Sequence, residues 1–204
     1  MTASPTLRDA AAVLAAAFAD TALFVHVEPD AERRAARLPW LFEGSLLHCS
    51  RYGSVEVVGH PDAPGVQAVA GWVPGPRLSL TAADLVRTGL VATPARLGPV
   101  QTRRLERHER ASERRLLDLL TDTTAYLWAL GTHPDRQGRG LGRSALQAAR
   151  EAMVGAGYDR CVLRTDEEAN VAWYRRQGFS VVETLDDLPS GLPAWILACQ
   201  PSTG

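Results

Sequence analysis

The feature that most constrains the fold of this chain is a glycine-rich stretch, HPDRQGRGLG, at His133–Gly142. The segment before it, Ala125–Thr132, is an apolar run bounded by threonine and proline, which is typical of a buried strand. In the segment after it, Leu141–Gly157, apolar residues recur at helical spacing. A strand, a glycine-rich turn and a helix in this order form a phosphate-binding layout, because the first helical turn has unpaired N–H groups that glycines leave accessible. The alternative is a turn that simply joins the strand to the helix.

Two familiar phosphate-binding loops do not fit this stretch. A P-loop requires Gly-Lys-Ser/Thr, and the chain contains no lysine. A dinucleotide-binding loop requires a third glycine where Arg143 stands, and the roughly sixty residues that follow are too few for the rest of that fold.

The N-terminal half predicts two helices and a hairpin. Thr6–Ala19, with Thr6 as its cap, and Asp30–Tyr52, interrupted by Pro39, have helical periodicity. Ser54–His60 and Val66–Pro74 are predicted strands, and the residues between them have the composition of a hairpin turn.

The C-terminal half predicts helices and strands in alternation. Residues 81–121 are helical and charged, which we interpret as a solvated helix face with His108 exposed. After the glycine-rich stretch and its helix, we expect a strand at Arg160–Asp166 and a short helix at Asn170–Phe179 that stops at Gly178. Two closing strands follow, at 179–185 and 194–200.

Composition excludes several classes of function. A length of 204 residues suits one domain, and a net charge of −1 gives no general reason to expect nucleic acid or a membrane as partner. The three cysteines lie far apart and have no zinc-ligand spacing, so we expect no metal site. No run approaches the length of a membrane span, and Ala10–Ala19 is interpreted as part of the first helix rather than as a signal peptide, so we expect a cytoplasmic protein.

Two motifs in fixed order resemble a known family. Gln137-x-x-Gly140-x-Gly142 is similar to the coenzyme A signature of the GNAT superfamily of N-acetyltransferases, Arg/Gln-x-x-Gly-x-Gly/Ala. The later NVAWYRRQGF resembles the family's Asn…Tyr-x-x-x-Gly-Phe segment, and the family's order of elements is reproduced over Ala125–Val182. AAAFAD near the N-terminus and the charged helical insert look like the puromycin N-acetyltransferase branch, an actinobacterial group associated with antibiotic resistance.

The resemblance implies an α+β fold. Its central sheet is mixed and mostly antiparallel, with two parallel strands that splay apart at the acetyl-CoA site and helices on both faces. Because the first predicted helix begins almost at the first residue, we expect the family's first strand to be short or missing. A single domain is expected over 1–204, with a helical insert at 81–121 and the acetyl-CoA-binding core at 125–182.

The resemblance also assigns the cofactor side of the site, with acetyl-CoA as co-substrate and no metal. Backbone groups of the first splayed strand would bind pantetheine and the oxyanion, and the glycine-rich stretch would hold the pyrophosphate. Tyr174 would protonate the departing thiolate. The expected cofactor-binding residues are Leu130, Gly131, Thr132, Gln137, Gly138, Arg139, Gly140, Leu141, Gly142, Arg143 and Asn170.

The acceptor side stays open. Acids at the end of the second splayed strand, Asp166, Glu167 and Glu168, are candidates for relaying the proton of the amine, and they equally complement a helix dipole. Glu56 and His133 are weaker candidates. The aromatic residues available for an acceptor pocket are Phe24, Trp40, Phe42, Tyr52 and Trp72.

The predicted function is N-acetylation of a small-molecule amine, such as an antibiotic or a related metabolite, by direct attack in a ternary complex. The predicted protein is a monomer or homodimer. The alternatives are an acetyltransferase of protein N-termini or lysines, and a domain that binds coenzyme A without catalysis.

Overall fold

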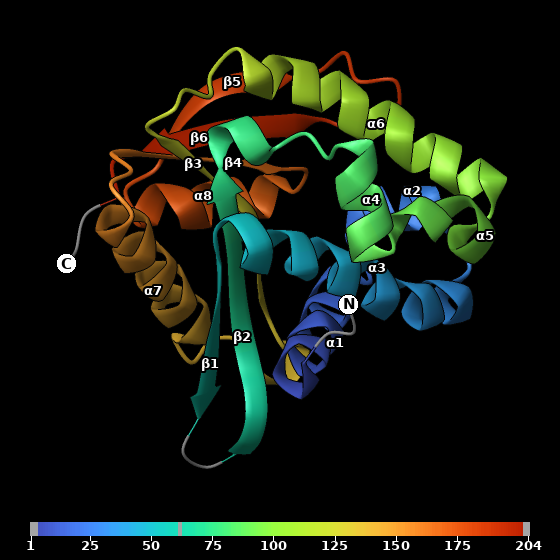
Figure 1. Cartoon of the computed structure of the whole chain (residues 1–204), viewed down its shortest axis with the longest axis horizontal. Helices are drawn as coiled ribbons and strands as arrows, with labels where there is room; N and C mark the ends of the chain where they lie inside the picture. The colour runs from blue at the N-terminus through green and yellow to red at the C-terminus, as the bar shows by residue number, and fades with distance from the viewer. Residues whose placement is uncertain (1–3, 61–62, 202–204) are drawn as a thin grey trace.

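The computed structural model describes residues 4–60 and 63–201, and its centre is a six-stranded sheet of order β1-β2-β3-β4-β6-β5 (Figure 1). Neighbouring strands are antiparallel except β3 and β4, which are parallel. The predicted mixed, mostly antiparallel sheet is therefore confirmed. The strands are β1 Ser54–His60, β2 Ala63–Pro74, β3 Thr124–Thr132, β4 Arg160–Thr165, β5 Ser180–Leu185 and β6 Ala194–Cys199.

Helices precede, interrupt and follow the strands. They are α1 Pro5–Phe18, α2 Ala22–Val27, α3 Ala31–Tyr52, α4 Ala82–Thr88, α5 Thr93–Leu97, α6 Pro99–Leu117, α7 Leu141–Gly155 and α8 Glu168–Arg176. Within the described residues the first element is α1. The predicted helical insert contains α4, α5 and α6. None of the described helices is both long and apolar enough to cross a membrane.

Side chains alternate between the two faces of the sheet, and each face has its own helices. On one face, α7 and α8 pack against a core that includes Ala70, Leu127 and Leu163. On the other face, α1, α3 and α6 cover Val69 and Val162 (Figure 1). The prediction of helices on both faces is confirmed.

The first helix begins earlier than predicted. Its cap is Ser4, whose hydroxyl accepts a hydrogen bond from the Leu7 N–H at 3.3 Å, and not Thr6. Pro5 occupies the first helical position, where its missing N–H leaves no donor unsatisfied.

The second predicted helix is continuous through Pro39. Its apolar residues Leu38, Phe42 and Leu46 are buried against α1 and the sheet, and this burial outweighs the hydrogen bond that proline removes. The short helix α2 was not expected. The predicted hairpin of β1 and β2 is confirmed by their antiparallel pairing, although residues 61–62 of its turn lie outside the described residues.

The connection from α3 to β1 tests the packing at this end of the sheet. A Cβ added at Gly53 would lie 2.1 Å from the Trp72 carbonyl oxygen, which is backbone and has no room to move aside. We expect Gly53→Ala to lower the free energy of unfolding by about 2–3 kcal/mol. Gly155→Ala is the control, since its Cβ meets nothing within 4 Å and alanine favours the helix by about 0.5–1 kcal/mol. Urea denaturation of both variants measures the difference, and equal stabilities would contradict the prediction.

Candidate active site

The parallel strands β3 and β4 separate after three residue pairs. Residues 124–126 of β3 face residues 160–162 of β4, and beyond them β3 pairs with β2 while β4 pairs with β6. The cause is a β-bulge: Ala129 lies opposite Gly71 and Leu127 opposite Trp72, so Trp128 is an extra residue that bends β3. The predicted splay is confirmed, and it leaves a wedge between the two strands with backbone exposed along the β4-facing edge of β3.

The glycine-rich stretch follows β3 directly and leads into α7. Gly138 and Gly140 have φ values of +76° and +81°, which glycine adopts without strain, and Gly140 is the N-cap of α7. The side-chain amide of Gln137 donates to the Thr132 carbonyl oxygen at 3.4 Å and ties the loop to the end of the strand. The loop thus places the unpaired N–H groups of a 15-residue helix beside the wedge.

The glycine residues and the two arginines of this loop suit it to binding an anion. A Cβ at Gly142 would lie 3.0 Å from the Thr132 hydroxyl oxygen, so α7 approaches the end of β3 closely only because this residue is glycine. Arg139 and Arg143 are both exposed and flank the helix start, where guanidinium groups add to the field of the helix dipole.

Tyr174 and Asn170 lie one helical turn apart on α8, and both line the cavity described below. The Tyr174 ring is buried and contacts the rings of Trp173 and Phe179 at centroid distances of 5.0 and 5.3 Å. This burial raises the pKa of Tyr174, so the residue remains a neutral phenol that is able to donate a proton. Asn170 donates to the Thr165 hydroxyl at 3.3 Å.

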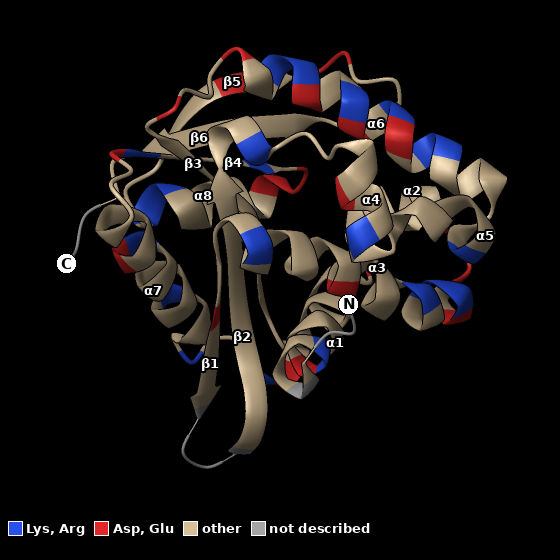
Figure 2. Cartoon of the chain, in the orientation of Figure 1, with Lys and Arg blue, Asp and Glu red and all other residues tan. Residues whose placement is uncertain are grey.

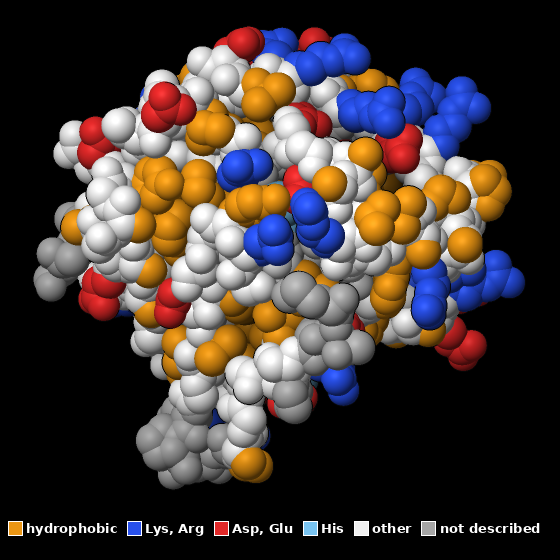
Figure 3. All heavy atoms as spheres, in the orientation of Figure 1, with side chains coloured by type: hydrophobic (Ala, Val, Ile, Leu, Met, Phe, Trp, Pro, Cys, Tyr) orange, Lys and Arg blue, Asp and Glu red, His pale blue; other side chains and the backbone are white. Residues whose placement is uncertain are grey.

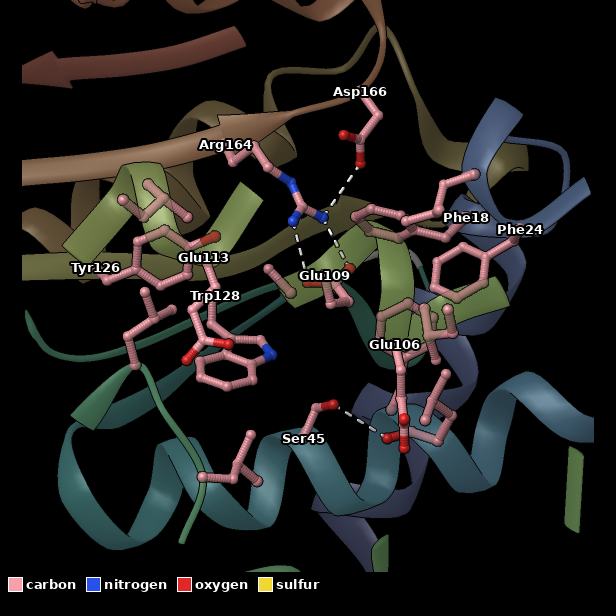
Figure 4. Close-up of a pocket in the computed structure, with 18 of the residues that line it drawn as sticks. Phe18, Phe24, Ser45, Glu106, Glu109, Glu113, Tyr126, Trp128, Arg164 and Asp166 are labelled. Atoms are coloured by element: carbon pink, nitrogen blue, oxygen red, sulfur yellow. Dashed lines mark hydrogen bonds and ion pairs between the residues drawn. The ribbon is translucent and has the colours of Figure 1, made fainter. Parts of the chain in front are cut away.

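A cavity of about 540 Å³ opens where the strands separate, within the size range of small-molecule pockets (Figure 4). Leu130, Thr165 and Tyr174 line it at the wedge, and residues from α1 to α6 form its other walls. Residues 137–143 are all described and do not line it. The glycine-rich loop and the cavity are therefore two separate regions that meet at the wedge.

Comparison with known proteins fits this geometry. Residues 107–179 match the acetyltransferase (GNAT) family. Over these residues the chain is similar to GNAT acetyltransferases. Acetyl-CoA is the donor that this family implies.

Several solved structures share the fold of this chain. The "histone acetyltransferase HPA2 and related acetyltransferase" from Corynebacterium glutamicum gives a TM-score of 0.62 at 20% identity, covering 100% of this chain and 96% of that one. The ribosomal-protein-S18-alanine N-acetyltransferase of Escherichia coli gives 0.54 at 14% identity, covering 100% and 94%. An agmatine N-acetyltransferase gives 0.54 at 14% identity, covering 87% and 86%.

The aromatic residues that line the cavity differ in part from those predicted. Phe24 and Phe42 line it as expected, whereas Trp40, Tyr52 and Trp72 do not. The aromatic residues that sequence reasoning missed are Phe18, Tyr126 and Trp128. Trp128 had no distinguishing signal, because the bulge that turns it toward the cavity depends on the pairing of β3 with β2.

The charged helix α6 is solvated on one face. Arginines and glutamates alternate along its outer side (Figure 2), and the space-filling view shows basic and acidic side chains mixed over this region (Figure 3). Its inner face buries Thr102, His108, Ser112 and Leu116.

The prediction that His108 is exposed was wrong. The ring is fully buried, with Nε2 3.1 Å from Asp166 Oδ1 and Nδ1 2.8 Å from the Ser190 hydroxyl. The spacing of Leu105, His108 and Leu116 would have placed all three on one helix face, and that periodicity was the signal for burial.

Arg164 on β4 is the centre of an ion-pair network beside the cavity. Its guanidinium group donates to both carboxylate oxygens of Glu109, at 3.0 and 2.9 Å, and to Asp166 at 3.3 Å (Figure 4). Burial alone would raise the pKa of the Asp166 carboxyl, but the charge of Arg164 and the hydrogen bond from His108 outweigh it and hold this pKa below its usual value.

The candidate bases are distributed unequally. Asp166 and Glu167 line the cavity, whereas Glu168, Glu56 and His133 do not. Glu167 accepts the Ala22 N–H at 2.6 Å and so anchors the first turn of α2. Of the candidate bases, Asp166 is therefore the one that lines the cavity without capping a helix.

The network gives Asp166 a pH-dependent role in stability. Because its folded-state pKa is lower than that of the unfolded chain, about 4, it stabilises the protein above that pH and loses this effect as the pH falls. We expect Asp166→Asn to be less stable than the natural protein near neutrality, with the difference shrinking as the pH falls from about 5 to about 3. Urea denaturation across this range measures it, with exposed Asp122→Asn as the control. A difference that stays constant with pH would contradict the assignment.

Proposed function

We propose that the protein transfers an acetyl group from acetyl-CoA to an amine of a small molecule, with both substrates bound at once. The observation that supports this proposal is the cavity of about 540 Å³, which reaches the wedge between β3 and β4 beside Tyr174. An amine in the cavity would meet a thioester in the wedge without either having to move.

The residues near the wedge fit acetyl-CoA. We infer that the free backbone edge at Leu130, Gly131 and Thr132 pairs with the amides of the pantetheine arm, as an added strand would. The N–H groups and guanidinium groups of the loop would hold the pyrophosphate. The residues of this loop are Gln137, Gly138, Arg139, Gly140, Leu141, Gly142 and Arg143, and Asn170 would face the cofactor from α8.

In the proposed reaction the amine nitrogen forms a bond to the thioester carbonyl carbon, and the carbon–sulfur bond then breaks. A backbone N–H near Leu130 or Gly131 would stabilise the negative charge on the carbonyl oxygen in between. Tyr174 gives its phenolic proton to the departing thiolate, and the amine loses a proton to water.

Protein N-termini and lysines are the alternative acceptors. The structural relatives include enzymes named for a ribosomal protein and for agmatine, and at 14% identity these likenesses bear on the fold alone. A small molecule is favoured because helices α1 to α6 contribute walls around the cavity, whereas a peptide requires an open groove. The N-terminal likeness to the puromycin N-acetyltransferase branch favours the same acceptor class, an antibiotic or a related metabolite.

The role of Tyr174 is testable by removing its hydroxyl. We expect Tyr174→Phe to lower kcat on the order of 10²-fold while the affinity for acetyl-CoA is retained, since the aromatic ring that packs on Phe179 is kept. Thiol release measures turnover, and a thermal shift with acetyl-CoA measures binding. Unchanged turnover would remove Tyr174 as the acid.

The glycine-rich loop is testable with a matched pair of variants. Gly140 and Gly157 have φ values of +81° and +87°, and an added Cβ meets nothing within 4 Å at either residue. Alanine should therefore cost both positions a similar amount of stability, about 1 kcal/mol. Only Gly140→Ala, at the N-terminus of α7, is expected to raise the KM for acetyl-CoA. An equal KM for the two variants would contradict the proposed binding of acetyl-CoA by the glycine-rich loop.

A further inference from the structure

One wall of the cavity is apolar and aromatic. Phe18 from α1, Phe24 from α2 and Phe42 from α3 line it and contact one another, with ring centroids 5.2–6.2 Å apart (Figure 4). These rings come from three helices that meet at the cavity, so they form a continuous surface. A surface of this kind binds an apolar or aromatic group.

Another part of the lining is acidic and comes from α6. Glu106, Glu109 and Glu113 are three and four residues apart, which places them on one helix face, and all three line the cavity. Two of them already have cationic partners: Glu109 pairs with Arg164, and Glu106 pairs with Arg110 at 3.3 Å.

Glu113 is in a different position. It is half-buried, and its carboxylate accepts a hydrogen bond from the Ser79 hydroxyl. Over residues 4–60 and 63–201 the ion pairs of the structure include none to Glu113. The carboxylate thus lines the cavity with a charge that no cation of the described residues pairs with, which favours a cationic group of a ligand at this point.

Trp128 adds to this preference. The bulge of β3 directs its indole into the same cavity, which Glu113 also faces (Figure 4). The face of an indole attracts a cation, most strongly where water is excluded. Glu113 and Trp128 together therefore favour a positive charge and disfavour a negative one.

We propose that the acceptor is an amine with an apolar or aromatic body and no acidic group, and that Glu113 selects it. This inference rests on the proposed function. An acceptor with a carboxylate beside its amine, such as a free amino acid, would place like charges together next to an apolar wall, where water screens them poorly. A cation without an apolar body would leave the phenylalanine surface exposed to water.

Three probes separate these features. Tryptamine has the amine and the aromatic body, tryptophan adds a carboxylate, and agmatine is a cation without an aromatic group. We expect kcat/KM for tryptamine to exceed that for the other two by about tenfold or more. We expect Glu113→Gln, which keeps a partner for Ser79, to reduce the preference for tryptamine over tryptophan by about tenfold. Asp118→Asn is the control, because it removes an exposed carboxylate at the end of α6 outside the cavity lining.

Calorimetric binding in the presence of coenzyme A gives a second measurement that needs no turnover. Tighter binding of tryptamine than of tryptophan and agmatine, weakened in Glu113→Gln and not in Asp118→Asn, supports the inference. Preference for tryptophan or agmatine, or a selectivity that Glu113→Gln leaves unchanged, overturns it. Selective binding without acetylation of any amine would contradict the proposed function and leave the ligand preference standing.

Discussion

The separation of β3 from β4 is the constraint on which the rest of the site depends. One inserted residue, Trp128, ends the pairing of the two strands and leaves a backbone edge free. It also changes which side chains share a face: Trp128 and Ala129 both pack toward α1 and α3, while Leu130 packs toward α7. This single bulge therefore accounts for the wedge and for one wall of the cavity. It also accounts for the change in which side chains of β3 point to each face of the sheet.

Close packing holds the end of β3 in this position. A Cβ at Gly131 would lie 2.9 Å from Leu14 Cδ2 of α1, and a Cβ at Gly142 would lie 3.0 Å from the Thr132 hydroxyl oxygen. The last residues of β3 are thus fixed between α1 on one side and the start of α7 on the other. The chain's own packing therefore holds the residues at the open end of the wedge in place.

Periodicity along the chain predicted the strands and the long helices, because these depend on local residue spacing. The bounds of β1 and the position of α7 after Gly140 follow from such patterns. The cap of α1 was misplaced because serine and threonine stand two residues apart, and Pro5 decides between them. The lining of the cavity was predicted poorly for a different reason. Its walls come from segments more than a hundred residues apart, such as Phe18 and Tyr126, and no local pattern encodes their contact.

The charged network around Arg164 shows how an unremarkable sequence pattern acquires a specific role. A buried ion pair adds little net stability, since losing water from the charges offsets most of their attraction. It does penalise alternative packing, because turning α6 by one residue, about 100°, would separate Glu109 from Arg164 and His108 from Asp166. We interpret the network as the feature that sets which face of α6 points inward. The same rotation would carry Glu113 out of the cavity, so the acidic wall depends on an interaction in which Glu113 takes no part.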